Sequence, residues 1–348
     1  MKYFLILIIA TLSACSIPYT KNDVFAEKAS LEVDELPHEK NSLEWWYFTG
    51  HLHDSTGKTY GVEYVFFHFT PTKLNDYMMV NVAISDLETK QFYYDYKIIK
   101  LKDWLIEGAL PLDLLVKNQE NDWTLKGQEG TYQLDASMQR HNYGLHLQTK
   151  PKKEVAMHSG TGYEDYGGLA KAGYYSYTRL TTKGNLVIDN KRVSVSGELW
   201  YDRQWNCGSV IKSKANWQWT SIQLHDTNDE LMLYSVHDRK KDRSIFGGTY
   251  TSSNGKSMHL SNEDILFKPL EFWVSSTSGK EYPTTWQISI PKLGYELKLK
   301  AVFPEQELIL KFPPLGTKLH YWEGACNVTG TKAGKSVTGD AYLEITKK

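Results

Sequence analysis

Apolar and aromatic residues alternate with polar residues along most of this chain, in short runs that end at turn-forming residues. Alternation with a period of two is the pattern of a half-buried β-strand, and spaced strands with turns between them are typical of a sandwich or barrel. Helical periodicity is limited to a turn near Leu112–Val116. We therefore expect strands over Glu44–Leu52, Tyr60–Phe69, Met78–Asp86, Gln91–Ile99, Trp123–Leu125, Thr131–Met138, Gly144–Thr149, Tyr174–Leu180 and Asn185–Ile188.

The stretch Val195–Trp205, with the sequence VSGELWYDRQW, is the most unusual of these runs. Alternate side chains of a strand point to opposite faces, so Glu198, Trp200 and Asp202 share one face. A buried carboxylate must be paired, or its pKa shifts upward and it becomes a proton donor. This face is therefore the first candidate for a functional site.

The same pattern of residue types returns near the end of the chain, in VTGDAYLE at Val337–Glu344. A second correspondence links Trp217–Thr227 to Trp45–Ser55, which align without gaps. Matching segments in the same order indicate two related halves with equivalent first and last strands. We predict an all-β fold of two tandem antiparallel barrels, over residues 36–209 and 210–348, each wide enough to hold one small ligand.

The connection Pro151–Gly173 breaks the strand pattern and is rich in glycine and charge. Loops of this length often form the lid or the mouth of a site. The loop contains His158 directly before Ser159, and a hydrolase needs an activated nucleophile of this kind. The chain has no Gly-x-Ser-x-Gly motif, so a secreted hydrolase is only a weaker alternative.

The first residues read as a targeting segment rather than as part of the fold. Lys2 precedes the apolar run Phe4–Leu12, which is too short to span a bilayer, and Leu-Ser-Ala before Cys15 resembles a bacterial lipoprotein cleavage site. We expect residues 1–15 to end at a lipidated Cys15 and residues 16–35 to form a tether. The residue after the cysteine is not Asp, which favours an outer-membrane anchor facing the periplasm.

Charge and cysteine content narrow the partners. The chain has 40 Lys and Arg against 41 Asp and Glu, so no basic surface is implied and nucleic acid is not an expected partner. The high content of Tyr and Trp suits β structure and apolar cavities. Besides Cys15, Cys207 and Cys326 are either bridged by a disulfide between the halves or present as two buried thiols.

The carboxylate face of Val195–Trp205 suits acid-catalysed hydration of an alkene. That reaction needs an acid, a dry pocket and a group that stabilises a carbocation. A desolvated Asp202 would supply the proton, while Glu198 would orient the water. Trp200 and Tyr177 would stabilise the cation through cation–π contact, worth about 2 kcal/mol when desolvated.

A structural role for the same carboxylates stays open. Asp202 or Glu198 would then pair with Arg203 or Arg179 where the barrels meet, and such ion pairs also perturb pKa values. Glu63 lies in an apolar strand and is either a second acid candidate or another structural group.

Several motifs together carry a family resemblance: EWWYFTGHL, YYSYTRL, GELWYDRQWNCG, WQWTSIQLHD and GDAYLEIT. In this order the chain resembles the AttH/CrtC family of lipocalin-like proteins, which includes carotenoid 1,2-hydratases and kievitone hydratase. The resemblance implies two lipocalin-like (calycin) barrels packed together. It also implies an acid in an aromatic-x-Asp motif, which Trp200-Tyr201-Asp202 matches, and we assign Tyr177-x-Arg179 to the place of a His-x-Trp motif.

We therefore expect an envelope lipoprotein that binds a hydrophobic, isoprenoid- or lipid-like molecule and hydrates or isomerises it. The alternatives are a carrier or scavenger without catalysis, and an envelope-assembly protein without a ligand. We expect no cofactor and no metal. The expected catalytic set is Asp202, Glu198, Trp200, Tyr177 and Arg179, and the expected ligand contacts are Trp45, Tyr47, Glu63, His68, Trp219 and Tyr342.

Overall fold

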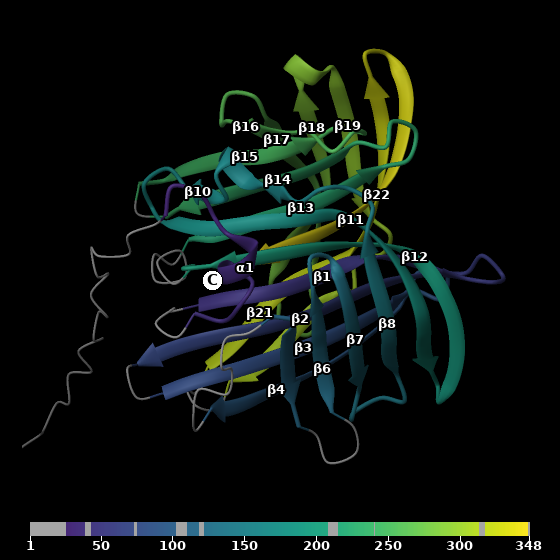
Figure 1. Cartoon of the computed structure of the whole chain (residues 1–348). Helices are drawn as coiled ribbons and strands as arrows, with labels where there is room; N and C mark the ends of the chain where they lie inside the picture. Colours follow the sequence, from purple (N-terminus) through teal and green to yellow (C-terminus); the bar gives the residue numbers. More distant parts are fainter. Residues whose placement is uncertain are drawn as a thin grey trace, which may run out of the picture.

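The structure, a computed structural model, describes residues 26–38, 43–72, 75–101, 110–117, 122–207, 215–239, 241–312 and 317–346. Most of them lie in two antiparallel sheets that pack against each other (Figure 1). The first, a 12-stranded sheet, has the order β4-β3-β2-β1-β12-β11-β8-β7-β6-β5, with β9 and β10 paired to β11. Its strands are β1 (Leu43–Asp54), β2 (Thr59–Thr72), β3 (Asn75–Asp86), β4 (Gln91–Leu101), β5 (Leu112–Val116), β6 (Trp123–Gln128), β7 (Thr131–Ser137), β8 (Gly144–Pro151), β9 (Ala156–Met157), β10 (Tyr163–Asp165), β11 (Lys171–Ile188) and β12 (Lys191–Trp205).

The second, a 10-stranded sheet, has the order β16-β15-β14-β13-β22-β21-β19-β18-β17, with β20 paired to β21. Helical structure in the described residues is limited to α1 (Leu31–Asp34) and two 3₁₀ turns, η1 (His158–Gly160) and η2 (Pro291–Leu293). The strands of the second sheet are β13 (Asn216–Leu224), β14 (Glu230–Asp238), β15 (Arg243–Thr251), β16 (Ser257–Leu260), β17 (Leu266–Val274), β18 (Glu281–Ile290), β19 (Tyr295–Ala301), β20 (Glu307–Phe312), β21 (Thr317–Lys332) and β22 (Lys335–Thr346).

The prediction of an all-β fold built from two antiparallel β units is confirmed. The helical turn expected near Leu112–Val116 is wrong, because this segment is strand β5. Its residues alternate between buried and exposed, with Leu112, Leu114 and Val116 pointing inward. The alternation of a short edge strand was mistaken for one helical turn because both place apolar residues at i and i+4.

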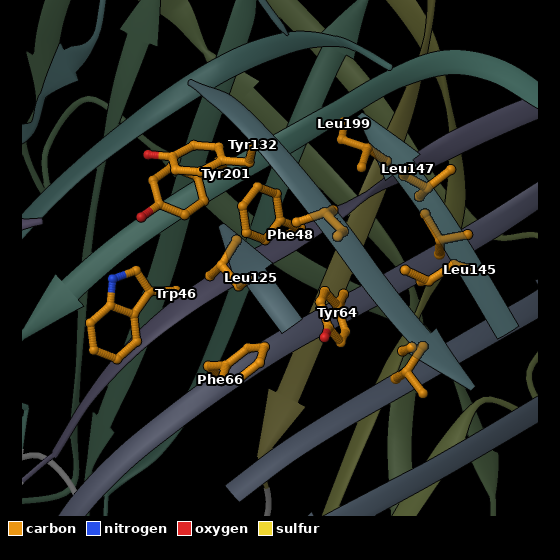
Figure 2. Close-up of a cluster of buried hydrophobic side chains, with 14 of the residues drawn as sticks. Trp46, Phe48, Tyr64, Phe66, Leu125, Tyr132, Leu145, Leu147, Leu199 and Tyr201 are labelled. Atoms are coloured by element: carbon orange, nitrogen blue, oxygen red, sulfur yellow. The ribbon is translucent and has the colours of Figure 1, made fainter. Parts of the chain in front are cut away.

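Each sheet curls around its own apolar cluster. Figure 2 shows the cluster of the first half, where Phe48 of β1 lies against Tyr132 of β7 and Tyr201 of β12, and Trp46 and Tyr64 belong to the same cluster. A separate cluster fills the second half. We expected each barrel to be wide enough to hold one small ligand and left open which of them has the cavity. Both interiors instead contain packed apolar side chains, and a cavity lies between the halves.

The segment around α1 packs into the first barrel. The buried carboxyl of Glu35 accepts hydrogen bonds from the hydroxyls of Tyr132 (2.6 Å) and Tyr201 (3.0 Å). Arg203 donates to the backbone carbonyl oxygens of this segment and to the Glu44 carboxylate, 2.6 Å away. Arg203 thus belongs to the core of the first half. The structural interpretation allowed it to pair with Asp202 or Glu198, but its carboxylate partner is Glu44.

The two halves meet through the outer faces of their first and closing strands. An apolar cluster between them combines Tyr47 and Trp200 of the first half with Trp219 and Tyr342 of the second. The sheets approach closely, since a Cβ on Gly61 would lie 2.8 Å from the Cβ of Ala325. The carboxylate-bearing faces found in the sequence are therefore interface faces rather than barrel interiors.

Cys207 and Cys326 are both free and buried, in different apolar clusters, so the disulfide considered from the sequence is not formed. The proposed signal peptide with Cys15, and the tether up to residue 25, lie outside the described residues. Among the residues that the structure describes, no helix has the length and apolar character needed to cross a bilayer.

Candidate active site between the two barrels

A cavity of about 330 Å³ lies between the two halves. The strands that contribute to its wall are β1, β2, β3, β11 and β12 in the first half and β13, β14 and β20 to β22 in the second. Most of the wall is apolar or aromatic, and three carboxyl groups interrupt it. The aromatic residues that line it are Trp45, Tyr47, Phe67, Phe69, Tyr166, Tyr174, Trp217, Trp219, Tyr234 and Tyr321, and the acids are Asp202, Glu323 and Glu344.

The wall is built from equivalent positions of the two repeats. Tyr47 stands opposite Asp202 in the ladder between β1 and β12, and Trp219 stands opposite Glu344 between β13 and β22. The repetition seen in the sequence therefore places one carboxylate of each half in the same cavity. The equivalent lining pairs are Trp45 and Trp217, Tyr47 and Trp219, Asp202 and Glu344, Gln204 and Thr346, and Tyr174 and Tyr321.

Asp202 is buried, and the donors that bind its carboxyl among the described residues are neutral. The Trp200 indole donates to Oδ1 at 2.5 Å, and the Tyr174 hydroxyl donates to Oδ2 at 2.6 Å. The Ser176 hydroxyl makes a third, short hydrogen bond to Oδ1. Burial raises the pKa of Asp202 to about 7, although these hydrogen bonds oppose the rise. The group can therefore donate or accept a proton near neutral pH.

His158 stands behind this carboxyl, in the loop expected to form a lid. Its Nε2 lies 2.7 Å from Ser176 Oγ, and its Nδ1 lies 2.7 Å from Thr249 Oγ1 in the second half. When Asp202 is ionised and accepts the hydroxyl proton of Ser176, Nε2 of His158 donates to Ser176 and Nδ1 accepts from Thr249. Burial lowers the pKa of His158 to about 3, so the ring is neutral. The sequence marked His158 only as the neighbour of Ser159 in a long loop and gave no sign of its contact with Ser176.

Glu344 and Glu323 form the second acidic part of the wall, side by side on β22 and β21. The Trp217 indole donates to Glu344 at 3.0 Å. Burial, and secondarily the charge of Asp202, raise the pKa of Glu344 to about 7. Glu323 is buried, and its Oε1 has no hydrogen-bond partner among the described residues. The hydroxyl of Tyr47, another residue of the cavity wall, also has no hydrogen-bond partner among them.

Two residues of the expected catalytic set lie elsewhere. Glu198 bonds Arg179 and Lys152 outside the cavity, and Arg179 also donates to Glu230 at 2.6 Å. These groups form an ion-pair network between the halves. Glu198 therefore has the structural role that we considered as the alternative to catalysis. That interpretation is wrong for Asp202, whose carboxyl has no arginine partner among the described residues.

Tyr177 of β11 points to the opposite face of the sheet from Asp202 of β12. It lies in the core of the first barrel, beside Tyr201. The expectation that it stabilises a cation next to Asp202 is therefore wrong. The positions next to Asp202 on the neighbouring strand belong to Tyr174 and Ser176, which take the place that we gave to Tyr177-x-Arg179.

The expected ligand contacts separate into two groups. Trp45, Tyr47 and Trp219 line the cavity, whereas Tyr342 is buried in the apolar interface without lining it. Glu63 is also buried and accepts from the Asn81 amide at 2.6 Å, and burial raises its pKa to about 8.

His68 is the last expected contact, and it is structural. It bridges Glu44 (2.7 Å) and Asp76 (2.6 Å) away from the cavity. Although burial alone would lower it, these hydrogen bonds raise the pKa of His68 to about 9.

The serine of the loop is not arranged as a nucleophile. Ser159 Oγ donates to Glu164 at 2.6 Å and lies 3.3 Å from His259 Nδ1. The same ring nitrogen is also the one that faces Glu164, so His259 cannot link the serine to the acid through opposite nitrogens. This geometry gives the hydrolase alternative no support.

Comparison with known proteins gives a consistent result. A family profile described as AttH-like matches residues 25–348. The AttH protein of Nitrosomonas europaea has a similar structure, with a TM-score of 0.78, 23% identity, and coverage of 93% of this chain and 98% of that chain. Kievitone hydratase from Nectria haematococca follows with a TM-score of 0.71, 17% identity and coverage of 92% and 93%.

A further sequence match is the dehydratase asqC of Emericella nidulans, 23% identical over 208 residues. The match spans 58% of this chain and 56% of that protein, so the chain aligns with little more than half of the length of this relative. The structural similarities at these identities establish the fold.

Proposed function

The chain belongs to the AttH-like family, and from this premise we propose that its cavity binds an apolar molecule and catalyses the gain or loss of water, with Asp202 as the acid. Two of the similar proteins are named a hydratase and a dehydratase, which are the two directions of one equilibrium. The observation that carries the proposal is a buried carboxyl, held by neutral donors, in the wall of an aromatic cavity.

In the direction of hydration, the proton of Asp202 passes to one alkene carbon and leaves a carbocation on the other. Water adds to this cation through a new C–O bond, and the proton that it releases returns to the Asp202 carboxylate. In dehydration, Asp202 protonates the hydroxyl, water leaves, and the neighbouring C–H proton goes to the carboxylate. The aromatic rings of Tyr47 and Trp219 exclude water and stabilise positive charge.

A carrier without catalysis is the second candidate, since an apolar cavity alone suffices for binding. The position of Asp202 favours the enzyme, because a site that only stores an apolar ligand gains nothing from a desolvated carboxyl in its wall. The hydrolase alternative has no suitably arranged nucleophile among the described residues. Lipid anchoring at Cys15 and an envelope location remain part of the proposal.

The test uses the full chain incubated with a lipid extract of its source cells in water enriched in heavy oxygen. Mass spectrometry should find a bound molecule that has gained heavy water, or lost water. Asp202→Asn should bind the same molecule while its rate falls by about a hundredfold or more. In the wild type, the rate should decline as the pH rises through about 7, because Asp202 must be protonated to act.

The matched control is Asp340→Asn, the same chemical change on β22 outside the cavity, which should keep the wild-type rate. A bound molecule that never exchanges or gains oxygen in the wild type would favour the carrier. Turnover that survives in Asp202→Asn would remove Asp202 as the acid.

A further inference from the structure

We infer that the cavity selects its ligand by charge: it takes an apolar molecule whose polar end donates a hydrogen bond, a hydroxyl or an ammonium group, and it rejects anions. This inference rests on the proposed function and names the class of substrate for the same site. It follows from three properties of the cavity wall.

The first property is the sign of the ionisable groups. Asp202, Glu323 and Glu344 line the cavity, and no Lys, Arg or His is among the described residues of its wall. A carboxylate, phosphate or sulfate on a ligand would enter an apolar space that offers no cation to pair with it, and its charge would oppose the ionisation of these three carboxyl groups. Fatty acids and phosphorylated isoprenoids therefore fit poorly.

The second property is a difference between otherwise equivalent repeats. Ser176 stands beside Asp202 on the neighbouring strand and donates to it, and Glu323 occupies the equivalent position beside Glu344. The acid of the first half is thus satisfied by its own donors. In the second half, Glu323 Oε1 is buried in the wall and has no donor among the described residues, so a ligand that donates there satisfies it.

The third property is the surface around these acids. Trp217, Trp219 and Tyr321 line the same part of the wall as Glu323 and Glu344, and aromatic faces attract positive charge. Leu310 and Leu319 supply apolar surface for the body of the ligand. Burial and the charge of Glu344 raise the pKa of Glu323 well above its usual range, in keeping with a group that has no cationic partner.

The test uses two fluorescent probes with one skeleton, neutral N-phenyl-1-naphthylamine and its sulfonated analogue 1-anilinonaphthalene-8-sulfonate. The full chain should bind the neutral probe at least about tenfold more tightly, a difference of about 1.4 kcal/mol. Competitors of one chain length should then displace the neutral probe in a fixed order, with 1-decanol and decylammonium ahead of decanoate by at least about tenfold.

Glu323→Gln and Glu344→Gln should reduce the difference in affinity between decanol and decanoate. Glu263→Gln, the same change at an exposed position outside the cavity, should leave this difference unchanged. Displacement by decanoate within about threefold of decanol would overturn the charge selection while leaving the binding cavity intact. Failure of the neutral probe to bind at all would instead contradict the proposed function. Both readings use the wild-type protein, so they do not depend on how the variants fold.

Discussion

Asp202 is held in an unusual protonation state because burial is opposed only by neutral hydrogen bonds. Its pKa in the folded protein, about 7, lies above the ordinary value of 3.8, so the folded state keeps this proton up to a higher pH than the unfolded state does. The contribution of Asp202 to stability is therefore greatest below about pH 4 and is lost as the pH rises to about 7. The carboxyl that we propose as the acid therefore destabilises the fold at neutral pH relative to acidic pH.

Asp202→Asn should remove this cost, because an amide cannot ionise. We expect the free energy of unfolding of the variant, relative to wild type, to increase with pH between about 4 and 7 and then to level off. The full change is on the order of 4 kcal/mol, at about 1.4 kcal/mol per pKa unit. Urea unfolding at a series of pH values measures it.

Asp340→Asn supplies a control of opposite sign. Although burial alone would raise it, the hydrogen bond from His225 holds the pKa of Asp340 below its ordinary value. The stability that ionised Asp340 contributes is present above its ordinary pKa of 3.8 and is lost as the pH falls below that value. That variant should therefore lose stability, relative to wild type, as the pH rises toward about 4, and this carboxyl adds no further change between about 4 and 7. A stability difference for Asp202→Asn that does not change with pH would show that the folded-state pKa is ordinary.

At this scale the sequence predicted the face shared by Trp200 and Asp202, because strand alternation depends on nothing but spacing. It could not place Tyr177, since the partner of Asp202 on β11 depends on the register between strands, which puts Ser176 there instead. His158 reaches the site through tertiary folding of a loop, and no local pattern marks that.

At the scale of elements, strands β2 and β21 determine how closely the halves approach. Gly61 faces Ala325 across the interface, and an added Cβ would lie only 2.8 Å from the Ala325 Cβ, closer than two methyl groups can pack. The backbone of Gly61 has an ordinary φ, so the restriction is steric.

Gly61→Ala should destabilise the protein by about 1–3 kcal/mol through overpacking. Adding Ala325→Gly, which moves the methyl group to the other side of the interface, should recover most of this loss. Chemical unfolding of the two single variants and the double variant measures both effects. Simple additivity of two destabilising changes in the double variant would contradict the close approach.

Most strands were predicted from alternation, and the errors have a common cause. Short segments such as Leu112–Val116 satisfy strand and helix patterns equally, and only pairing with β6 decides between them.

At the scale of the whole molecule, a buried ionic network joins the halves. The carboxylate of Glu230 in the second half accepts hydrogen bonds from Arg179 Nε at 2.6 Å and from Lys153 Nζ at 2.7 Å, both in the first half. Together with the apolar interface cluster, this network should make the barrels unfold as one unit.

We therefore expect a single urea transition, with circular dichroism and tryptophan fluorescence changing together. Glu230→Gln leaves buried Lys153 without its carboxylate partner, while Arg179 keeps its ion pair with Glu198. The substitution should shift both signals equally, at a cost of up to about 3–5 kcal/mol. Glu263→Gln, at an exposed position, should leave the transition where it is. Separate transitions for the two signals in the wild type would mean that the halves are independent.

The two related halves were predictable from the repeat, but the place of the cavity was not. Both faces of β1 and β12 are rich in aromatic residues: Trp46 and Tyr201 fill the barrel, while Tyr47 and Trp200 face the other half. Composition alone cannot tell which of two apolar faces points inward.

The equivalent lining positions have a consequence for the history of the chain. Two copies of one ancestral barrel that met through the same face would have formed a twofold-symmetric pocket, with identical residues repeated on both walls. Once duplication joined the copies in one gene, each wall could change separately. Such a history would leave pairs that occupy equivalent places but differ in residue type, as Asp202 and Glu344, Tyr47 and Trp219, and Ser176 and Glu323 do. An asymmetric substrate could then be accommodated by an originally symmetric pocket.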